Sequence, residues 1–148
     1  LDDIVRMHQE AEKLSGKQSQ EVGEVRKLAD ELIKGGFKIV TGGTDNHLML
    51  VDLRPKSITG KASEASLGRA HITANKNAIP NDPQKPTVTS GIRFGSPAIT
   101  TRGFGAGETR ELADLIANVL EAPQDARVIE RTAAAAKALC ARFPVYER

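Results

Sequence analysis

The segment Thr89–Phe104, TSGIRFGSPAITTRGF, is the most informative stretch of this 148-residue chain. Residues 88–94 have the apolar and β-branched content of a short strand, and a proline-marked turn follows. Arg93 lies in that strand between Gly91 and Gly95, and glycine lets backbone or ligand approach closely. The planar guanidinium of arginine matches a carboxylate, so we expect Arg93 to bind a small carboxylic acid.

Regular structure is expected on both sides of this segment. Apolar residues at helical spacing predict helices over residues 1–14, 22–33, 107–120 and 128–143, and Gly35-Gly36 ends the second of them. Residues 37–40 and 47–53 predict two strands joined by a polar turn, an arrangement that favours antiparallel pairing.

The region between these strands and Arg93 is less regular. Thr59 predicts the cap of a short helix over residues 60–70, in which Gly68 would permit close packing. Residues 71–74 look extended. Three prolines then predict an irregular loop over residues 75–87, and loops of this length are often functional. Strands and helices are therefore segregated, which predicts an α+β sandwich with helices on a small, mostly antiparallel sheet.

Composition excludes several classes of function. The net charge is +2 with both signs interspersed, and aromatic residues make up 3%, so we expect neither nucleic-acid nor membrane binding. No metal site is expected, since the histidines lack ligand spacing. Cys140 is the single cysteine and lies in an apolar stripe, so we expect it to be buried. A single cysteine cannot form an internal disulfide, and together with the lack of a signal-peptide pattern this indicates the cytoplasm. The start at Leu1 indicates a fragment.

Five motifs occur in the order found in one family. They are TGGTDNHL at 41–48 with VDL at 51–53, TGK at 59–61 with LGRA at 67–70, NKN at 75–77 with IPNDP at 79–83, the 89–104 segment, and LCxxFPVY at 139–146. Together they resemble serine hydroxymethyltransferase, a pyridoxal-phosphate enzyme. The resemblance is to its smaller, C-terminal domain, of the kind found in fold-type-I pyridoxal-phosphate enzymes.

The resemblance implies a division of the chain. Residues 21–148 would form the C-terminal domain, and residues 1–20, which resemble the family least, a helical connector. The Schiff-base lysine and most of the cofactor site would lie in a large domain of the same enzyme. No Thr-Thr-His-Lys-like motif occurs in the chain, so we expect the chain alone to be inactive, with no catalytic residue of its own.

The resemblance also assigns site residues. Arg93 matches the arginine that binds the α-carboxylate of serine or glycine, and Asn77 an asparagine near the pterin ring of tetrahydrofolate. Thr87 stands where the family often has an aromatic residue, which predicts a weaker stacking contribution to the folate pocket. We expect supporting roles for Arg102, beside the arginine-bearing segment, and for His47, at a turn-to-strand junction.

The implied function is that of a part of an enzyme. Serine and tetrahydrofolate would be the substrates, pyridoxal phosphate the cofactor, and the large domain and a homo-oligomer the partners. Two alternatives stay open at this point. One is a freestanding folate-binding or regulatory module without catalysis. The other is a different fold-type-I enzyme, such as an aminotransferase, which shares the carboxylate-binding arginine but does not explain the 75–83 motif.

Overall fold

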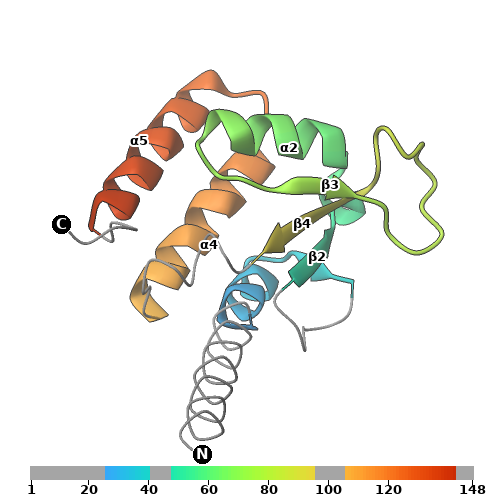
Figure 1. Ribbon diagram of the computed structural model, residues 1–148, viewed down its shortest axis with the longest axis horizontal. Coiled ribbons are helices and arrows are strands. Elements are labelled where there is room, and N and C mark those ends of the chain that lie inside the picture. The colour runs from blue at the N-terminus through green and yellow to red at the C-terminus, as the bar shows by residue number, and fades with distance from the viewer. Residues whose placement is uncertain (1–25, 41–47, 96–105, 143–148) are drawn as a thin grey trace, which may run out of the picture.

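A computed structural model describes residues 26–40, 48–95 and 106–142 (Figure 1). Its first element is a helix over residues 26–34, and the others follow in chain order. They are β1 (Lys38–Ile39), β2 (Leu48–Asp52), the short 3-10 helix η1 (Arg54–Lys56), α2 (Gly60–Arg69), β3 (Asn75–Asn77), β4 (Gly91–Gly95), α4 (Ala106–Glu121) and α5 (Ala126–Arg142). The predicted α+β class is confirmed.

The described strands form one antiparallel sheet in the order β1-β2-β4-β3. In the register between β2 and β4, Val51 pairs with Ile92 and Leu50 pairs with Arg93. Because side chains alternate along a strand, Val51 and Ile92 project to one face and Leu50 and Arg93 to the other.

The helices pack on the face that carries Val51 and Ile92, whose side chains are fully buried. Figure 1 shows α2 beside β3 and β4, with α4 passing behind α2 and α5 to the left of both. The core contains apolar side chains from the sheet and every described α-helix, among them Leu28, Leu32, Met49, Val51, Leu67, Ile92, Phe94, Ile116, Leu120 and Leu139. Full burial of one such side chain contributes roughly 1.5–3 kcal/mol. We call the opposite side of the sheet the outer face.

The 26–34 helix ends as the glycine pair predicts. Gly36 has a φ of +88°, its N–H donates to the carbonyl of Ile33 at 3.0 Å, and the N–H of Phe37 donates to Leu32 at 3.0 Å. These are the two bonds of a Schellman motif, which satisfies the last carbonyls of the helix and turns the chain into β1.

Helix α2 begins at its expected cap. The hydroxyl of Thr59 accepts a hydrogen bond from the N–H of Ala62 at 3.2 Å. The expectation for Gly68 is wrong, because this residue is exposed and a Cβ there would meet nothing within 4 Å. The glycine that lies against the sheet is Gly60, where a Cβ would stand 2.4 Å from the carbonyl oxygen of Gly91.

Residues 75–77 differ from the expectation. Sequence analysis placed them in an irregular loop, but they form the edge strand β3, which pairs with β4. The N–H of Lys76, on the side away from β4, donates to Glu64 of α2 at 2.7 Å. This carboxylate satisfies an edge donor that would otherwise be free to pair with another chain, and it holds β3 against α2.

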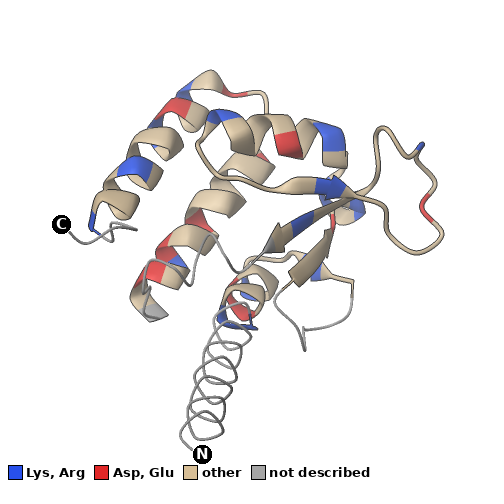
Figure 2. Ribbon diagram, viewed as in Figure 1, with Lys and Arg blue, Asp and Glu red and all other residues tan. Residues whose placement is uncertain are grey.

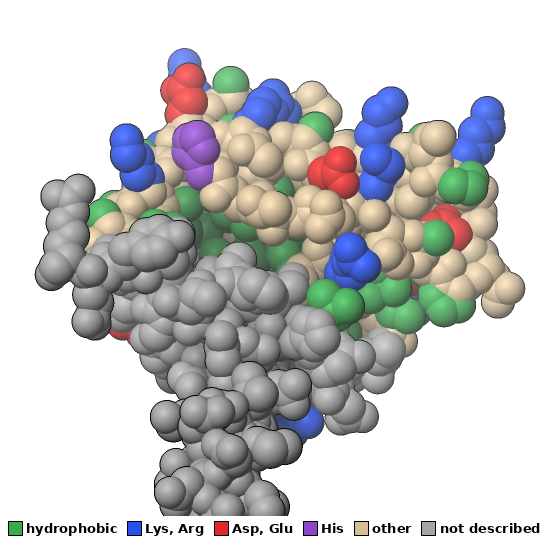
Figure 3. Space-filling view, in the orientation of Figure 1, with side chains coloured by type: hydrophobic (Ala, Val, Ile, Leu, Met, Phe, Trp, Pro, Cys, Tyr) green, Lys and Arg blue, Asp and Glu red, His purple; other side chains and the backbone are tan. Residues whose placement is uncertain are grey.

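The two C-terminal helices lie where their apolar stripes predict them. Cys140 in α5 is half-buried rather than buried. Charged side chains of both signs are spread over α2, α4 and α5 (Figure 2). In the space-filling view, several of them project along the upper edge of the molecule (Figure 3). In the part of the chain that the structure describes, no helix is long and apolar enough to cross a membrane.

The exposed His71 should limit stability. It follows α2 in a second Schellman motif, with φ at +62° and with Ile72 N–H donating to Leu67 at 2.9 Å. Asparagine tolerates this left-handed conformation better than other non-glycine residues. We therefore expect His71→Asn to raise the free energy of unfolding by about 0.5 kcal/mol, seen as a rise in Tm of roughly 1–2 °C. His71→Ala should lower it, and an alanine variant as stable as the asparagine variant would contradict this reading.

Gly91 and Gly68 should respond oppositely to alanine. A Cβ on Gly91 would lie 2.6 Å from the carbonyl oxygen of Asn77 and 2.8 Å from Ile79, so β3 or the following loop must move. We expect Gly91→Ala to cost about 1–3 kcal/mol of unfolding free energy. Gly68→Ala, in open space on a helix, should instead stabilise by up to about 1 kcal/mol. Thermal unfolding of both variants checks this, and equal effects would refute it.

Candidate functional site

Arg93 lies near the middle of the outer face. Its strand β4 is flanked by β2 and β3, and the register places Leu50 on one side of Arg93 and Asn75 on the other. Because the N–H of Lys76 points away from β4 toward Glu64, Asn75 and Asn77 are the residues of β3 that exchange backbone hydrogen bonds with β4.

Asn77 shares this face with Arg93. It pairs with Gly91, two residues before Arg93, and is therefore a diagonal neighbour of Arg93 across adjacent strands. Such diagonal neighbours are about 7–8 Å apart, within reach of long side chains. The structure thus places on one face, and on adjacent strands, the two residues for which the family resemblance predicts carboxylate and folate binding.

The side chain of Asn77 is half-buried and held locally. Its amide nitrogen Nδ2 donates to the carbonyl of Ala78 at 2.8 Å. An amide has a second N–H and a carbonyl oxygen, and no hydrogen bond from the described residues is recorded for either of them on Asn77. With respect to the described residues, the amide therefore has one donor and its acceptor available to a ligand.

Two arginines on this side of the sheet are in contrasting situations. Arg54 is committed to Asp52, with its Nη2 at 2.8 Å from Oδ2 and its Nε at 3.1 Å from Oδ1. Arg93 is half-buried, and no carboxylate among the described residues forms an ion pair with it. Of these two arginines, Arg93 is the one whose guanidinium can donate to a ligand carboxylate.

The Asp52–Arg54 pair is a structural feature of the end of β2. Asp52 is 2% exposed and also accepts from the backbone N–H of Arg54 at 3.0 Å. The hydrogen bonds from the Arg54 side chain lower the pKa of Asp52 in spite of its burial. Lys38 adds a second cation at 3.7 Å. The carboxylate stays ionised here, and its charge is neutralised within the fold.

Sequence reasoning missed three contributors to this region: Asn75, Asp82 and the Asp52–Arg54 pair. Asn75 and Asn77 are two residues apart, the spacing that places both on one face of a strand, and this was the available signal. Asp82 accepts several hydrogen bonds within the 78–90 loop. Its position in the sequence Asn81-Asp82-Pro83 is typical of a side chain that bonds its own loop.

The two supporting residues cannot be placed. His47 and Arg102 lie outside the described residues, so their roles stay predictions. The same holds for the second half of the 89–104 segment, beyond Gly95. Within the described ranges, no group of three or more His, Cys, Asp or Glu side chains could hold a metal ion.

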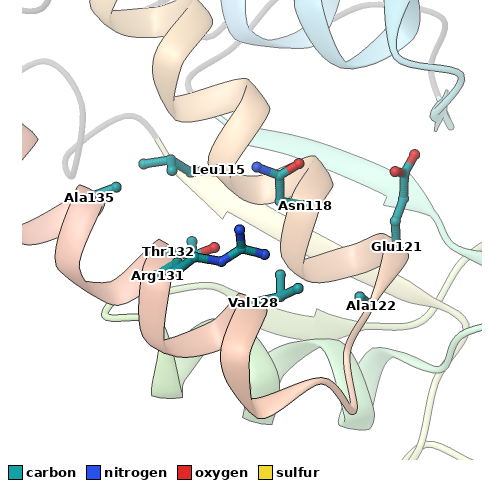
Figure 4. Close-up of a pocket in the computed structure, with 8 residues that line it drawn as sticks. All are labelled: Leu115, Asn118, Glu121, Ala122, Val128, Arg131, Thr132 and Ala135. Atoms are coloured by element: carbon teal, nitrogen blue, oxygen red, sulfur yellow. The ribbon is translucent and has the colours of Figure 1, made fainter.

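A cavity of about 500 Å³ lies away from the sheet, between α4 and α5. Figure 4 shows the guanidinium of Arg131 and the amide of Asn118 directed into it, with Leu115 and Val128 in its walls. None of its lining residues belongs to a strand. It is therefore separate from the outer face that carries Arg93 and Asn77.

The outer face can thus bind two chemical groups side by side. A bidentate guanidinium suits a carboxylate, and the neighbouring carboxamide suits the hydrogen-bonding edge of a heterocycle. The adjoining Leu50 offers apolar contact, since its side chain is half-buried on the same face.

Comparisons with known proteins agree with the motifs. The family profile for serine hydroxymethyltransferase matches residues 5–116. The serine hydroxymethyltransferase of Nitrosospira multiformis is 62% identical over 130 residues, covering 88% of this chain and 31% of that protein. The enzyme of Paracoccus denitrificans is 58% identical over 134 residues, with 86% and 31% covered. That of Methylobacillus flagellatus is 57% identical over 129 residues, with 87% and 31% covered.

The chain spans about a third of the length of these relatives, at 31% of each. The division at residues 20 and 21 is not tested by these matches and stays a prediction. The family profile covers well over half of the chain, and these relatives are identical to it at more than half of the aligned positions. The chain therefore belongs to the serine hydroxymethyltransferase family.

Proposed function

We propose that this chain supplies the amino-acid-carboxylate and folate contacts of a serine hydroxymethyltransferase. The whole enzyme would convert serine and tetrahydrofolate to glycine and 5,10-methylenetetrahydrofolate, a step of one-carbon metabolism and amino-acid biosynthesis. The observation that carries the proposal is the placement of Arg93 and Asn77 as neighbours on the outer face, on adjacent strands.

Arg93 would bind the α-carboxylate of serine or glycine with two parallel hydrogen bonds. A bidentate contact sets the orientation of the amino acid as well as its affinity, and orientation decides which bond at Cα can react. The rigid position of Arg93 in the centre of the sheet favours this role, because the backbone on both sides of it is paired.

Asn77 would contact the pterin ring of tetrahydrofolate. Its remaining donor and its acceptor suit the ring edge, and its position beside Arg93 would place the folate next to the amino acid, to which the one-carbon unit must pass. Thr87 is exposed in the 78–90 loop that follows Asn77, and it supplies no aromatic surface for stacking on the pterin ring.

Pyridoxal phosphate belongs to the proposed whole enzyme, where it would stabilise the carbanion formed at Cα. The described residues do not fit it as an anchor. The lysines beside the sheet are paired with carboxylates: Lys38 with Asp52 at 3.7 Å, Lys56 with Glu121 at 3.6 Å and Lys76 with Glu64 at 3.8 Å. A Schiff base requires an amine that is free to bond covalently to the cofactor, whereas each of these amines lies against a carboxylate. We assign the anchor to a large domain.

The partners of this proposal are the large domain and a second copy of the enzyme, and its location is the cytoplasm. A freestanding folate-binding or regulatory module remains the alternative, and a continuous upstream reading frame with the Schiff-base lysine would remove it. The family assignment favours a hydroxymethyltransferase over an aminotransferase.

Replacing Arg93 in the full-length enzyme tests the proposal. Lysine keeps the charge but loses the bidentate geometry, so we expect Arg93→Lys to weaken serine binding about 100-fold, in line with the energy of a buried charge pair. Calorimetric titration with serine measures this, and thermal unfolding checks the fold.

Arg131→Lys is the matched control, because Arg131 lines the α4–α5 cavity away from the sheet. It should leave serine affinity unchanged. An Arg93→Lys enzyme that binds serine as tightly as the parent would refute the assignment of Arg93. A loss of serine binding in the Arg131 variant instead would place the site between α4 and α5.

A further inference from the structure

Asp82 joins the two ends of the 78–90 loop. Its Oδ2 accepts from the backbone N–H of Ile79 at 3.2 Å and from that of Ser90 at 2.8 Å. Its Oδ1 accepts from the N–H of Gln84 at 2.9 Å and from the hydroxyl of Ser90 at 2.7 Å. One carboxylate therefore links the residues that follow β3 to the residue that precedes β4.

The Ser90 end of the loop has further anchors. The N–H groups of Gly60 and Lys61, at the start of α2, donate to the carbonyls of Thr89 at 3.0 Å and Val88 at 2.9 Å. The N–H of Leu53 donates to the carbonyl of Ser90 at 2.9 Å. The start of β4 is thus held by two other elements, and it does not depend on Asp82 alone.

The Ile79 end depends on Asp82 more directly. Asp82 holds the N–H of the peptide unit between Ala78 and Ile79. The carbonyl of that same peptide unit accepts the hydrogen bond from Asn77 Nδ2 at 2.8 Å. Because a peptide unit is planar, fixing its N–H also fixes the direction of its carbonyl. The orientation of the Asn77 amide is therefore coupled to Asp82 through one rigid plane.

We propose that Asp82 is a positioning residue that orients the Asn77 carboxamide toward its ligand through the Ala78–Ile79 peptide. The inference rests on the proposed function, since it takes Asn77 as the residue that contacts folate. It assigns Asp82 no contact with substrate. Its effect should be confined to folate, because Arg93 lies in the strand that α2 and β2 hold independently.

The charge state of Asp82 suits this role. Desolvation acts to raise its pKa, but the hydrogen bonds from Gln84, Ser90 and Ile79 outweigh it and lower the pKa to about 2. Arg54 lies near enough that Asp82 contributes to raising the pKa of its guanidinium. The carboxylate is therefore ionised near neutral pH, where both of its oxygens can accept hydrogen bonds.

The test uses the full-length enzyme and separate calorimetric titrations with tetrahydrofolate and with serine. Asp82→Ala should weaken tetrahydrofolate binding about tenfold and change serine binding less than twofold, a split that general destabilisation would not produce. Asp82→Asn, which keeps one acceptor oxygen, should give a smaller effect in the same direction and serves if the alanine variant fails to fold. Tetrahydrofolate affinity unchanged in folded variants, or a parallel loss for both ligands, would overturn the inference.

A double-mutant cycle separates this inference from the proposed function. In an Asn77→Ala background, Asp82→Ala should have no further effect on tetrahydrofolate affinity, because its effect passes through the Asn77 amide. Additive losses would overturn the positioning role of Asp82 while leaving the folate contact of Asn77 in place. If Asn77→Ala alone leaves tetrahydrofolate affinity unchanged, the folate contact itself is refuted and the inference with it.

The control and an independent measurement complete the design. Asp125 is a matched carboxylate that accepts backbone N–H groups of Arg127 at 2.9 Å and Val128 at 3.4 Å at the start of α5. Asp125→Ala should lower stability without changing tetrahydrofolate affinity. Hydrogen exchange at the Ile79 amide should be faster in Asp82→Ala than in the parent, because this N–H loses its acceptor, and the measurement needs no ligand. An unchanged exchange rate would overturn the positioning role of Asp82.

Discussion

The pairing of β3 with β4 depends on the absence of a side chain at Gly91. This residue pairs with Asp52 on one side and with Asn77 on the other. A Cβ there would meet the backbone of Asn77, the side chain of Ile79 and, at 3.1 Å, the side chain of Leu50. The close approach lets β3 and the start of the 78–90 loop lie directly against the centre of the sheet. The relative position of Asn77 and Arg93 follows from it.

The two arginines on the outer face differ in whether a described carboxylate neutralises them. At the end of β2, Asp52 and Arg54 satisfy each other, and a buried carboxylate with that many donors serves the fold. Toward the middle of the sheet, Arg93 has no carboxylate partner among the described residues. Within the described residues, the guanidinium of Arg54 is neutralised and that of Arg93 is available to an external carboxylate. Because the chain belongs to the serine hydroxymethyltransferase family, we propose that this carboxylate is the α-carboxylate of serine or glycine.

The elements that sequence patterns predicted well are those whose signal is local. The apolar stripe of α4, the Thr59 cap and the Gly35-Gly36 helix end each depend on residues within a turn or two of one another. Residues 75–77 were misassigned to a loop because Asn-Lys-Asn has little intrinsic preference for a strand. Its extended form comes from pairing with β4 and from the Glu64 carboxylate, which are distant in sequence. Gly68 was misread for a similar reason, since only packing reveals which helix glycine lies against the sheet.

The sequence by itself determined the family and the fold class, because both follow from the order of its motifs and from its local patterns. It also singled out Arg93 and Asn77 as candidate site residues through the family resemblance. The tertiary structure alone decided that these two residues are neighbours on one face, and that Arg54 is paired with a carboxylate while Arg93 has no carboxylate partner among the described residues. It also decided that Asp82 and the Asn77 amide bond the same peptide unit. These are matters of strand register and of hydrogen bonds that close a loop. Register depends on which residues pair across strands, and no local pattern around Arg93 or Asn77 contains that information.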